Sequence, residues 1–320
     1  MRPGFARWAV RMHSRETLEV FPAMDQQQSP PLLDPQFLAR LEQLELVSRK
    51  IFLGLMKGER RSKRKGQSVE FADYRNYVKG DDLRFLDWNL YARLDRLFIR
   101  LFMEEEDLHF YVLIDSSLSM DFGKPTKLHY AKQVAAALAF VGLVNMDRVV
   151  VEAFNERLTQ SLPAVRGRRS LWRVLSFLQK VAPAGASNLR ESLRTFSIKS
   201  SGKGIVVLLS DFMDKQGYED ALRYLVARQF DIYVIQVLSQ EEIEPEVVGD
   251  LKLIDVEDDD AAEITVSAPL LKRYKQNLAA FRGTLSDFCL RRGITYLFTG
   301  NQIPFDRLVL TYLRQRGLVK

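Results

Sequence analysis

The chain of 320 residues contains one cysteine, Cys289, which excludes an intramolecular disulfide and a metal site built from several thiolates. Cys289 lies with Leu285, Phe288 and Leu290 at helical spacing, which predicts a buried and unreactive thiol. Histidine is almost as rare. The three histidines, at positions 13, 109 and 129, are scattered and form no pattern for a histidine-based catalytic site.

Long apolar runs are also missing. No stretch approaches the roughly 18 apolar residues that a membrane-spanning helix needs. The first residues, MRPGFARWAVRMHSRE, carry arginines where a secretory signal has its apolar core. We therefore expect a cytoplasmic protein without a membrane span. Residues 24–34 are polar and contain prolines, so residues 1–34 are expected to form a disordered extension.

Two catalytic motifs are absent. The sequence has neither the G-x-S-x-G turn of serine hydrolases nor the G-x-x-x-x-G-K-[ST] loop of ATP-binding enzymes, so we expect no enzymatic activity. A metal-dependent phosphoryl hydrolase stays as the enzymatic alternative, because aspartyl phosphatases also begin at an aspartate that ends a strand. They typically need a second aspartate two residues later, where this chain has Ser117.

What is present is the composition of a folded protein, with 47% hydrophobic and 28% charged residues. The net charge of +6 is a mild excess, although six basic residues gather at positions 57–65. This basic run lacks the interleaved aromatic residues that stack on single-stranded nucleic acid. A solvated loop is the simplest interpretation, and an acidic protein partner or a nucleic-acid-binding module are the alternatives.

From residue 109 onward, segments typical of strands and helices alternate. Apolar runs predict strands at 109–115, 147–154, 204–211, 231–238 and 294–300. Helical spacing of apolar residues predicts helices at 125–143, 170–181, 188–196, 218–229, 268–291 and 304–316. The segment 241–263, with eleven carboxylates and one lysine, is expected to form a loop or a hairpin. The alternation predicts an α/β fold with a mainly parallel, Rossmann-type sheet and helices on both faces.

Two of the predicted strands end in aspartate. Asp115 ends HFYVLID and is followed by SSLSM, so that Asp115, Ser117 and Ser119 spell D-x-S-x-S; Asp211 ends GIVVLLSD. A further hydroxyl comes from Ser187 in PAGASNL, just before a predicted helix. Ligands of such sheets bind beyond the carboxyl ends of the strands, where these five residues should therefore meet.

The chemistry of this set predicts a metal. Oxygen ligands select hard divalent cations, here Mg²⁺ or Mn²⁺, which keep some coordination positions for water. Three hydroxyls and two carboxylates are five oxygen ligands, which leaves at least one open position on a six-coordinate ion. A carboxylate from another protein can fill that position, which favours protein binding over hydrolysis. The simpler alternative is that both aspartates cap helices and the serines belong to a turn.

With these motifs, the sequence resembles bacterial von Willebrand factor A-like proteins of unknown function that are found with MoxR-type AAA ATPases. The resemblance covers about residues 35–316. It rests on DSSLSM at 115–120, GASNL at 185–189 and LLSDF at 208–212, and on GQSVEFADYRNYVKGDDLRFLDWNLYARLDRLFIRLFMEEED at 66–107. That second block is the more diagnostic. One departure is Gly185-Ala186-Ser187, where the family commonly has Gly-Gly-Thr; alanine adopts a positive φ less readily than glycine.

Apolar residues at helical spacing predict a helix at about 35–55. The resemblance implies a von Willebrand factor A-like domain at 107–320, preceded at 35–106 by this helix and a small β-rich arm. It also implies an adaptor that works with a MoxR-type AAA ATPase on an unknown client protein. Asp115, Ser117, Ser119 and Ser187 would ligate the metal, and Asp211 would act through a water.

The arm alternates acidic and basic residues in short strands. Their simplest role is a network of paired charges that fixes the arm onto the von Willebrand factor A-like domain, with Trp88 as apolar filler. The alternative is a docking surface for the partner. Its candidate residues, together with the basic run, are Lys57, Arg60, Arg61, Arg84, Trp88 and Arg93.

Overall fold

The computed structural model describes residues 32, 38–39, 41, 54–55, 70–104, 109–202, 204–245, 249–254, 257, 261–313 and 318. The chain divides into two compact units. The larger comprises Met1–Arg49 and Leu108–Lys320, and the smaller, which we call the arm, is Lys50–Asp107. Most of the helix predicted at 35–55 lies outside the described residues, as does the extension at 1–34 apart from Leu32. Residues 38, 39 and 41 are helical.

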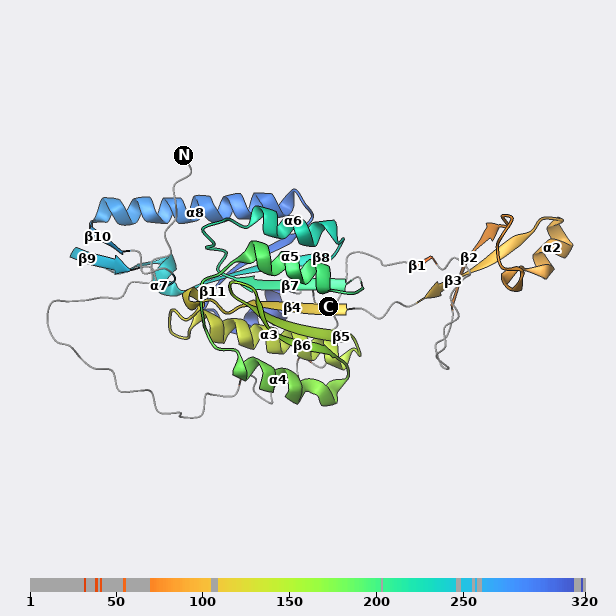
Figure 1. Ribbon diagram of the computed structural model, residues 1–320, viewed down its shortest axis with the longest axis horizontal. Coiled ribbons are helices and arrows are strands. Elements are labelled where there is room, and N and C mark those ends of the chain that lie inside the picture. The colour runs from red at the N-terminus through yellow and green to blue at the C-terminus, as the bar shows by residue number, and fades with distance from the viewer. Residues whose placement is uncertain are drawn as a thin grey trace. The chain divides into compact units, whose positions relative to one another are not determined.

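The larger unit is built on a six-stranded sheet in the order β11-β8-β7-β4-β5-β6 (Figure 1). Five of the strands run parallel, and β6 pairs antiparallel with β5 at the edge. The prediction of an α/β fold with a mainly parallel sheet is confirmed. The strands are β4 (His109–Asp115), β5 (Arg148–Phe154), β6 (Leu158–Val165), β7 (Gly204–Ser210), β8 (Asp231–Leu238) and β11 (Thr295–Gly300).

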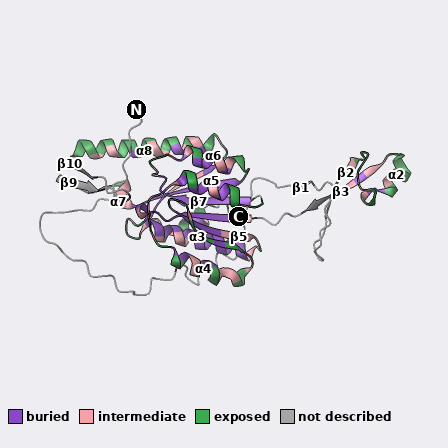
Figure 2. Ribbon diagram, viewed as in Figure 1, coloured by how far each residue is buried: buried purple, intermediate pink, exposed green. Residues whose placement is uncertain are grey.

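The central strands are apolar throughout because both of their faces are covered. In β4, Phe110, Val112 and Ile114 pack in one hydrophobic cluster, and Tyr111 and Leu113 pack in another. Consecutive side chains of a strand point to opposite faces, so the two clusters lie on the two sides of the sheet. Figure 2 shows the strands buried and the outer helix surfaces exposed.

Helices α3 and α4 cover one face, and α5, α6 and α8 cover the other (Figure 1). Each predicted helix of this region is present within a few residues of its expected ends, except that the last is divided into a helical turn and a π-helical segment. They are α3 (Lys127–Val144), α4 (Leu171–Lys180), α5 (Leu189–Lys199), α6 (Glu219–Ala227), α8 (Ala268–Leu290), α9 (Phe305–Arg307) and η4 (Leu308–Leu313).

The acidic segment after β8 forms short structure at the edge where the parallel strands end. Helix α7 (Gln240–Ile243) begins with a capping box in which Ser239 and Glu242 bond to each other's backbone N–H groups. A hairpin of β9 (Gly249–Ile254) and β10 (Ala261–Val266) follows, with Ile254 paired to Ala261. A hairpin was one of the two expected forms of this segment.

Two further expectations concern burial and membrane spans. Cys289 is buried in the core between α8 and the sheet, and burial raises the pKa of its thiol to about 12, as predicted for an unreactive cysteine. Among the helices of the described part of the chain, none is long and apolar enough to cross a membrane.

The arm is a three-stranded antiparallel sheet in the order β1-β3-β2 with one α-helix. Its elements are β1 (Gly54–Leu55), β2 (Glu70–Asn76), the 3-10 helix η1 (Leu83–Phe85), α2 (Trp88–Leu94) and β3 (Phe98–Glu104). Because Gly54 and Leu55 pair with β3, the prediction that the preceding helix extends to residue 55 is wrong at that end. Strand pairing outweighs the local apolar spacing there.

Paired charges hold the arm together. Asp87 is nearly buried and accepts hydrogen bonds from Arg100 Nε (2.8 Å), from Tyr74 Oη (3.2 Å) and from two N–H groups at the start of α2. Arg75 bonds to Asp81 (2.8 Å), and Arg84 pairs with its neighbour Asp82. These three ion pairs all join residues within the arm.

The candidate partner-binding residues of the arm lie at its surface. Arg84 and Arg93 are exposed, and Trp88 leaves 62% of its surface in solvent, so Trp88 is not part of the interior of the arm. Trp88 instead stacks edge-on against Tyr91. Lys57, Arg60 and Arg61 lie outside the described residues.

We predict that Asp87→Ala loosens the arm, because it removes both the N-cap of α2 and the partner of Arg100. Amides at the start of α2 should exchange with deuterium faster in this variant. The control is Asp95→Asn: Asp95 is exposed and has left-handed backbone, which asparagine also adopts, so these exchange rates should change little. Equal protection in both variants would contradict this role.

The same carboxylate should resist acid. The hydrogen bond from Arg100, followed by that from the Leu90 N–H, lowers the pKa of Asp87 to about 2. Because the pKa of Asp87 is lower in the folded than in the unfolded chain, its ionised form stabilises the fold at pH values above the usual titration range of aspartate. This stabilisation is lost as the pH falls towards 2. Protection of α2 should therefore persist in mild acid.

Candidate metal centre

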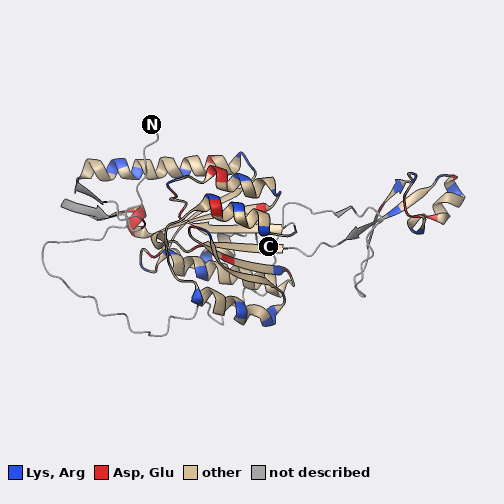
Figure 3. Ribbon diagram, in the orientation of Figure 1, with Lys and Arg blue, Asp and Glu red and all other residues tan. Residues whose placement is uncertain are grey.

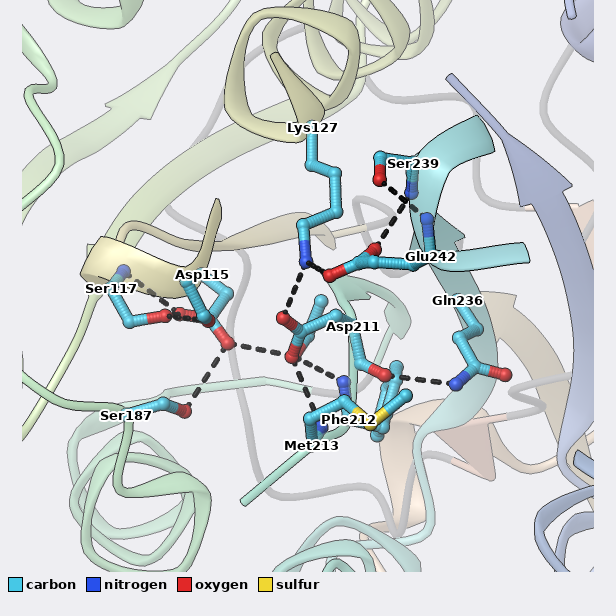
Figure 4. Close-up of polar contacts among 12 residues, drawn as sticks. Asp115, Ser117, Lys127, Ser187, Asp211, Phe212, Met213, Gln236, Ser239 and Glu242 are labelled. Carbon is cyan, nitrogen blue, oxygen red and sulfur yellow. Dashed lines mark hydrogen bonds and ion pairs between the residues drawn. The ribbon is translucent and has the colours of Figure 1, made fainter. Parts of the chain in front are cut away.

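Asp115 ends β4 and is completely buried. Its Oδ1 accepts from the backbone N–H (3.0 Å) and the hydroxyl (2.7 Å) of Ser117. Its Oδ2 accepts from the hydroxyls of Ser210 (2.7 Å) and Ser187 (3.2 Å). Three different segments of the chain therefore converge on one carboxylate, as Figure 4 shows for the labelled residues.

The two serines of the D-x-S-x-S motif lie together. Ser117 precedes a single 3-10 turn, η2 (Leu118–Met120), which brings Ser119 back so that the two Oγ atoms are 3.0 Å apart. Since the proton of Ser117 is donated to Asp115, Ser119 donates in this second bond. Ser116, between them and Asp115, instead donates its hydroxyl to the carbonyl of Phe154 (2.9 Å).

The loop that carries Ser187 is fixed to the first loop by its backbone. Ala184 N–H donates to the Ser116 carbonyl (2.9 Å), and Leu118 N–H donates to the Gly185 carbonyl (2.9 Å). Gly185 has a φ of +64°, whereas Ala186 is not among the residues with positive φ. Only the first residue of the Gly-Ala-Ser segment needs left-handed backbone, so alanine at 186 leaves the loop shape intact.

Asp211 directly follows β7, the neighbour of β4 in the sheet. Its Oδ1 accepts from the Met213 N–H (3.0 Å), and its carbonyl accepts from the side-chain amide of Gln236 (2.8 Å). Phe212, inside this turn, is buried with a φ of +60°. A bulky residue in left-handed backbone is strained, and hydrogen bonds on both sides of it hold the turn.

A buried ammonium completes the polar cluster. Lys127, the first residue of α3, is fully buried; its Nζ donates to Asp211 Oδ2 (2.9 Å) and to Glu242 Oε1 (2.6 Å) (Figure 4). Glu242 lies on α7 and also accepts from the Ser239 N–H (2.8 Å). Helices α3 and α7 and the end of β7 are thereby joined through one side chain.

The electrostatics of this cluster favour a cation. Burial, and then the charge of Asp211, raise the pKa of Asp115. Burial would lower the pKa of Lys127, but the carboxylates of Asp211 and Glu242 outweigh it and the pKa is raised. If all four groups are ionised, three carboxylates face one ammonium, which leaves two negative charges. A divalent cation balances that excess and reverses the upward shift at Asp115.

The donor geometry suits a small ion that binds oxygen. In an octahedron with Mg–O distances near 2.1 Å, neighbouring oxygens lie about 3 Å apart. The Ser117–Ser119 and Ser187–Asp115 oxygen separations, 3.0 and 3.2 Å, are of this size. Among the described residues, no group of three or more His, Cys, Asp or Glu side chains is placed to hold a metal.

The five predicted residues lie at one edge of the sheet, but the structure adds others that the sequence did not indicate. Ser210 had a weak signal, because it directly precedes the strand-terminal aspartate. Lys127 had none: lysine at the start of a helix is ordinarily exposed. Glu242 lay in an acidic segment assigned to the rim of the sheet. Asp211 bonds to Lys127 through one oxygen and to a backbone N–H through the other, which suits a role through water.

The fold and this cluster define a mixed α/β protein with a polar site at the carboxyl ends of its parallel strands. A family model described as "Protein of unknown function DUF58" matches residues 73–284, more than half of the chain. The chain belongs to that family, which bears out the predicted membership of a family of unknown function.

Relatives and solved structures are also similar. The uncharacterized proteins Mb1516 of Mycobacterium bovis and Rv1480 of Mycobacterium tuberculosis are each 28% identical over 258 residues, 79% of this chain and 81% of theirs. Among solved structures, the conserved hypothetical protein BatB from Bacteroides thetaiotaomicron has 14% identity and a TM-score of 0.41, over 65% of this chain and 98% of that one. An aerotolerance-related membrane protein from Bacteroides fragilis has 13% identity and a TM-score of 0.41, over 65% and 97%.

We predict that Lys127→Met destabilises the larger unit by about 3–5 kcal/mol, because it leaves buried carboxylates without their counter-charge. Urea unfolding should show this loss. Lys180→Met, which removes an exposed lysine from the end of α4, should change the free energy of unfolding little. The double variant Lys127→Met/Glu242→Gln should recover part of the loss; strictly additive effects would argue against coupling between the two groups.

Proposed function

We propose that this protein is a metal-dependent protein-binding module of the von Willebrand factor A type. Asp115, Ser117, Ser119 and Ser187 would hold one Mg²⁺ or Mn²⁺, with Asp211 acting through a water. The ion supplies a coordination position that a carboxylate of the partner fills. The observation that carries the proposal is that the hydroxyls of Ser117 and Ser187, from two loops, bond to the buried carboxylate of Asp115, while the Ser119 hydroxyl lies 3.0 Å from that of Ser117.

The surroundings of Asp115 favour binding over hydrolysis. An aspartyl phosphatase typically needs a second aspartate two residues after its nucleophile. This chain has Ser117 in that position, and its hydroxyl donates to Asp115. Lys127, which could stabilise a transferred phosphoryl group, is directed at Asp211 and Glu242. The basic run 57–65, on which a nucleic-acid-binding function would rest, lies outside the described residues.

The partner that we propose is a MoxR-type AAA ATPase, with the chain acting as an adaptor towards a client protein. The support for this is the resemblance of the arm sequence at 66–107 and of the metal motif. The exposed Trp88 next to Arg84 and Arg93 also supports a docking role for the arm, because tryptophan and arginine are common at the centres of protein interfaces.

Metal binding can be tested with two adjacent serines. Ser117→Ala removes a proposed ligand, whereas Ser116→Ala removes only a hydroxyl bonded to the Phe154 carbonyl. We expect Mg²⁺ to raise the melting temperature of the wild type and of Ser116→Ala through ligand linkage. Isothermal titration should show Mn²⁺ binding at least about 10-fold weaker for Ser117→Ala. Equal affinities in the two variants would overturn the site.

Partner binding is tested by affinity capture from the native lysate with the purified protein. We expect a MoxR-type AAA ATPase to be retained with Mg²⁺ and lost with EDTA or with Ser117→Ala. Ser116→Ala should retain it. Capture that ignores both metal and Ser117 would place the interface elsewhere, and Trp88→Ala in the same assay would then test the arm.

A further inference from the structure

The acidic hairpin reaches back to the candidate metal centre. Glu257 lies between β9 and β10, and its Oε2 accepts a hydrogen bond from the backbone N–H of Ser187 at 3.2 Å. The hydroxyl of the same serine donates to Asp115 Oδ2. One residue, Ser187, therefore contacts the central carboxylate with its side chain and the carboxylate of Glu257 with its backbone.

This contact is not needed to cap a helix. The N–H groups at the start of α5 have other partners: Leu189 N–H donates to Asp214 Oδ2 (2.7 Å), and Glu191 N–H donates to the side chain of Asn188 (3.0 Å). Ser187 precedes the helix and its cap. Glu257, 70 residues away in the sequence, thus bonds to the ligand-bearing loop itself and not to the helix end.

We propose that Glu257 is a tethered carboxylate that closes the open side of the bound metal when no partner is present. It deepens the function proposed above and rests on it. A carboxylate is the group that the partner is expected to offer, and the hairpin supplies one to the same loop from within the chain. A divalent ion held by Asp115 and Ser187 attracts Glu257, so the partner's carboxylate competes with an internal one.

It follows that the partner offers an acidic side chain and must displace the carboxylate of Glu257. Such competition lowers the apparent affinity for the partner in proportion to the fraction of molecules in which Glu257 leaves the metal position free. It also restricts binding to partners that make further contacts, because a lone carboxylate competes poorly with a tethered one of the same chemistry. Selectivity thereby comes from the hairpin as well as from the metal.

The test uses Mn²⁺ as the probe in the full chain, with Glu257→Gln compared to Glu241→Gln. Glu241 is an exposed glutamate on α7, and its substitution removes the same charge. Water proton relaxation reports how many rapidly exchanging waters the bound Mn²⁺ carries. We expect a higher relaxation enhancement and roughly 10-fold weaker Mn²⁺ binding for Glu257→Gln. Acetate, a free carboxylate, should then lower the enhancement at smaller concentrations than in the wild type.

The outcomes separate the two proposals. If wild type and Glu241→Gln bind Mn²⁺ and Glu257→Gln matches them in affinity, relaxation and acetate response, the tethered carboxylate is overturned and the metal site stands. If Glu241→Gln shifts all three quantities as much as Glu257→Gln does, the effect is one of net charge, which also overturns it. If the wild type binds no Mn²⁺, the metal function itself fails and this inference fails with it.

Discussion

The buried carboxylate of Asp115 is the group on which the organisation of the larger unit depends. It ends the central strand β4, where water cannot solvate it, and a buried charge must be compensated by hydrogen bonds or by an opposite charge. Four hydrogen bonds from Ser117, Ser187 and Ser210 meet that requirement. To donate them, Ser117 in the loop after β4, Ser187 in the loop after α4 and Ser210 at the end of β7 must lie at the same edge of the sheet. The geometry of the site is thus also the geometry that makes the carboxylate tolerable.

The second constraint is the balance of charge around it. Lys127 bonds to Asp211 and Glu242 and fixes α3, α7 and the turn after β7 to one another (Figure 4). Its single positive charge does not match three carboxylates, and the shortfall of two charges is that of a divalent ion. The lysine thus compensates one of the buried carboxylate charges and leaves two uncompensated when all four groups are ionised.

The surface charge has a corresponding pattern. Basic residues lie along α3 and α4, and acidic residues lie on α7, at the edge of the sheet where the parallel strands end (Figure 3). Acidic residues near a metal site raise the local affinity for cations. The arm is a separate unit with its own paired charges, and its exposed aromatic side chains, Trp88 and Tyr91, are suited to protein contacts.

The α/β class and the parallel strands could be predicted from the sequence alone. So could the meeting of five residues at one edge of the sheet: Asp115, Ser117, Ser119, Ser187 and Asp211. Both predictions were possible because strand and helix periods are local properties of the chain, and because parallel strands bring their carboxyl ends to one edge. The hydrogen-bond partners of Lys127, Ser210, Glu242 and Glu257 became known only from the tertiary structure. Their partners lie 84, 95, 115 and 70 residues away in the sequence. A single polar residue belongs to no repeating pattern, so neither its burial nor its distant partner can be predicted from the neighbouring sequence.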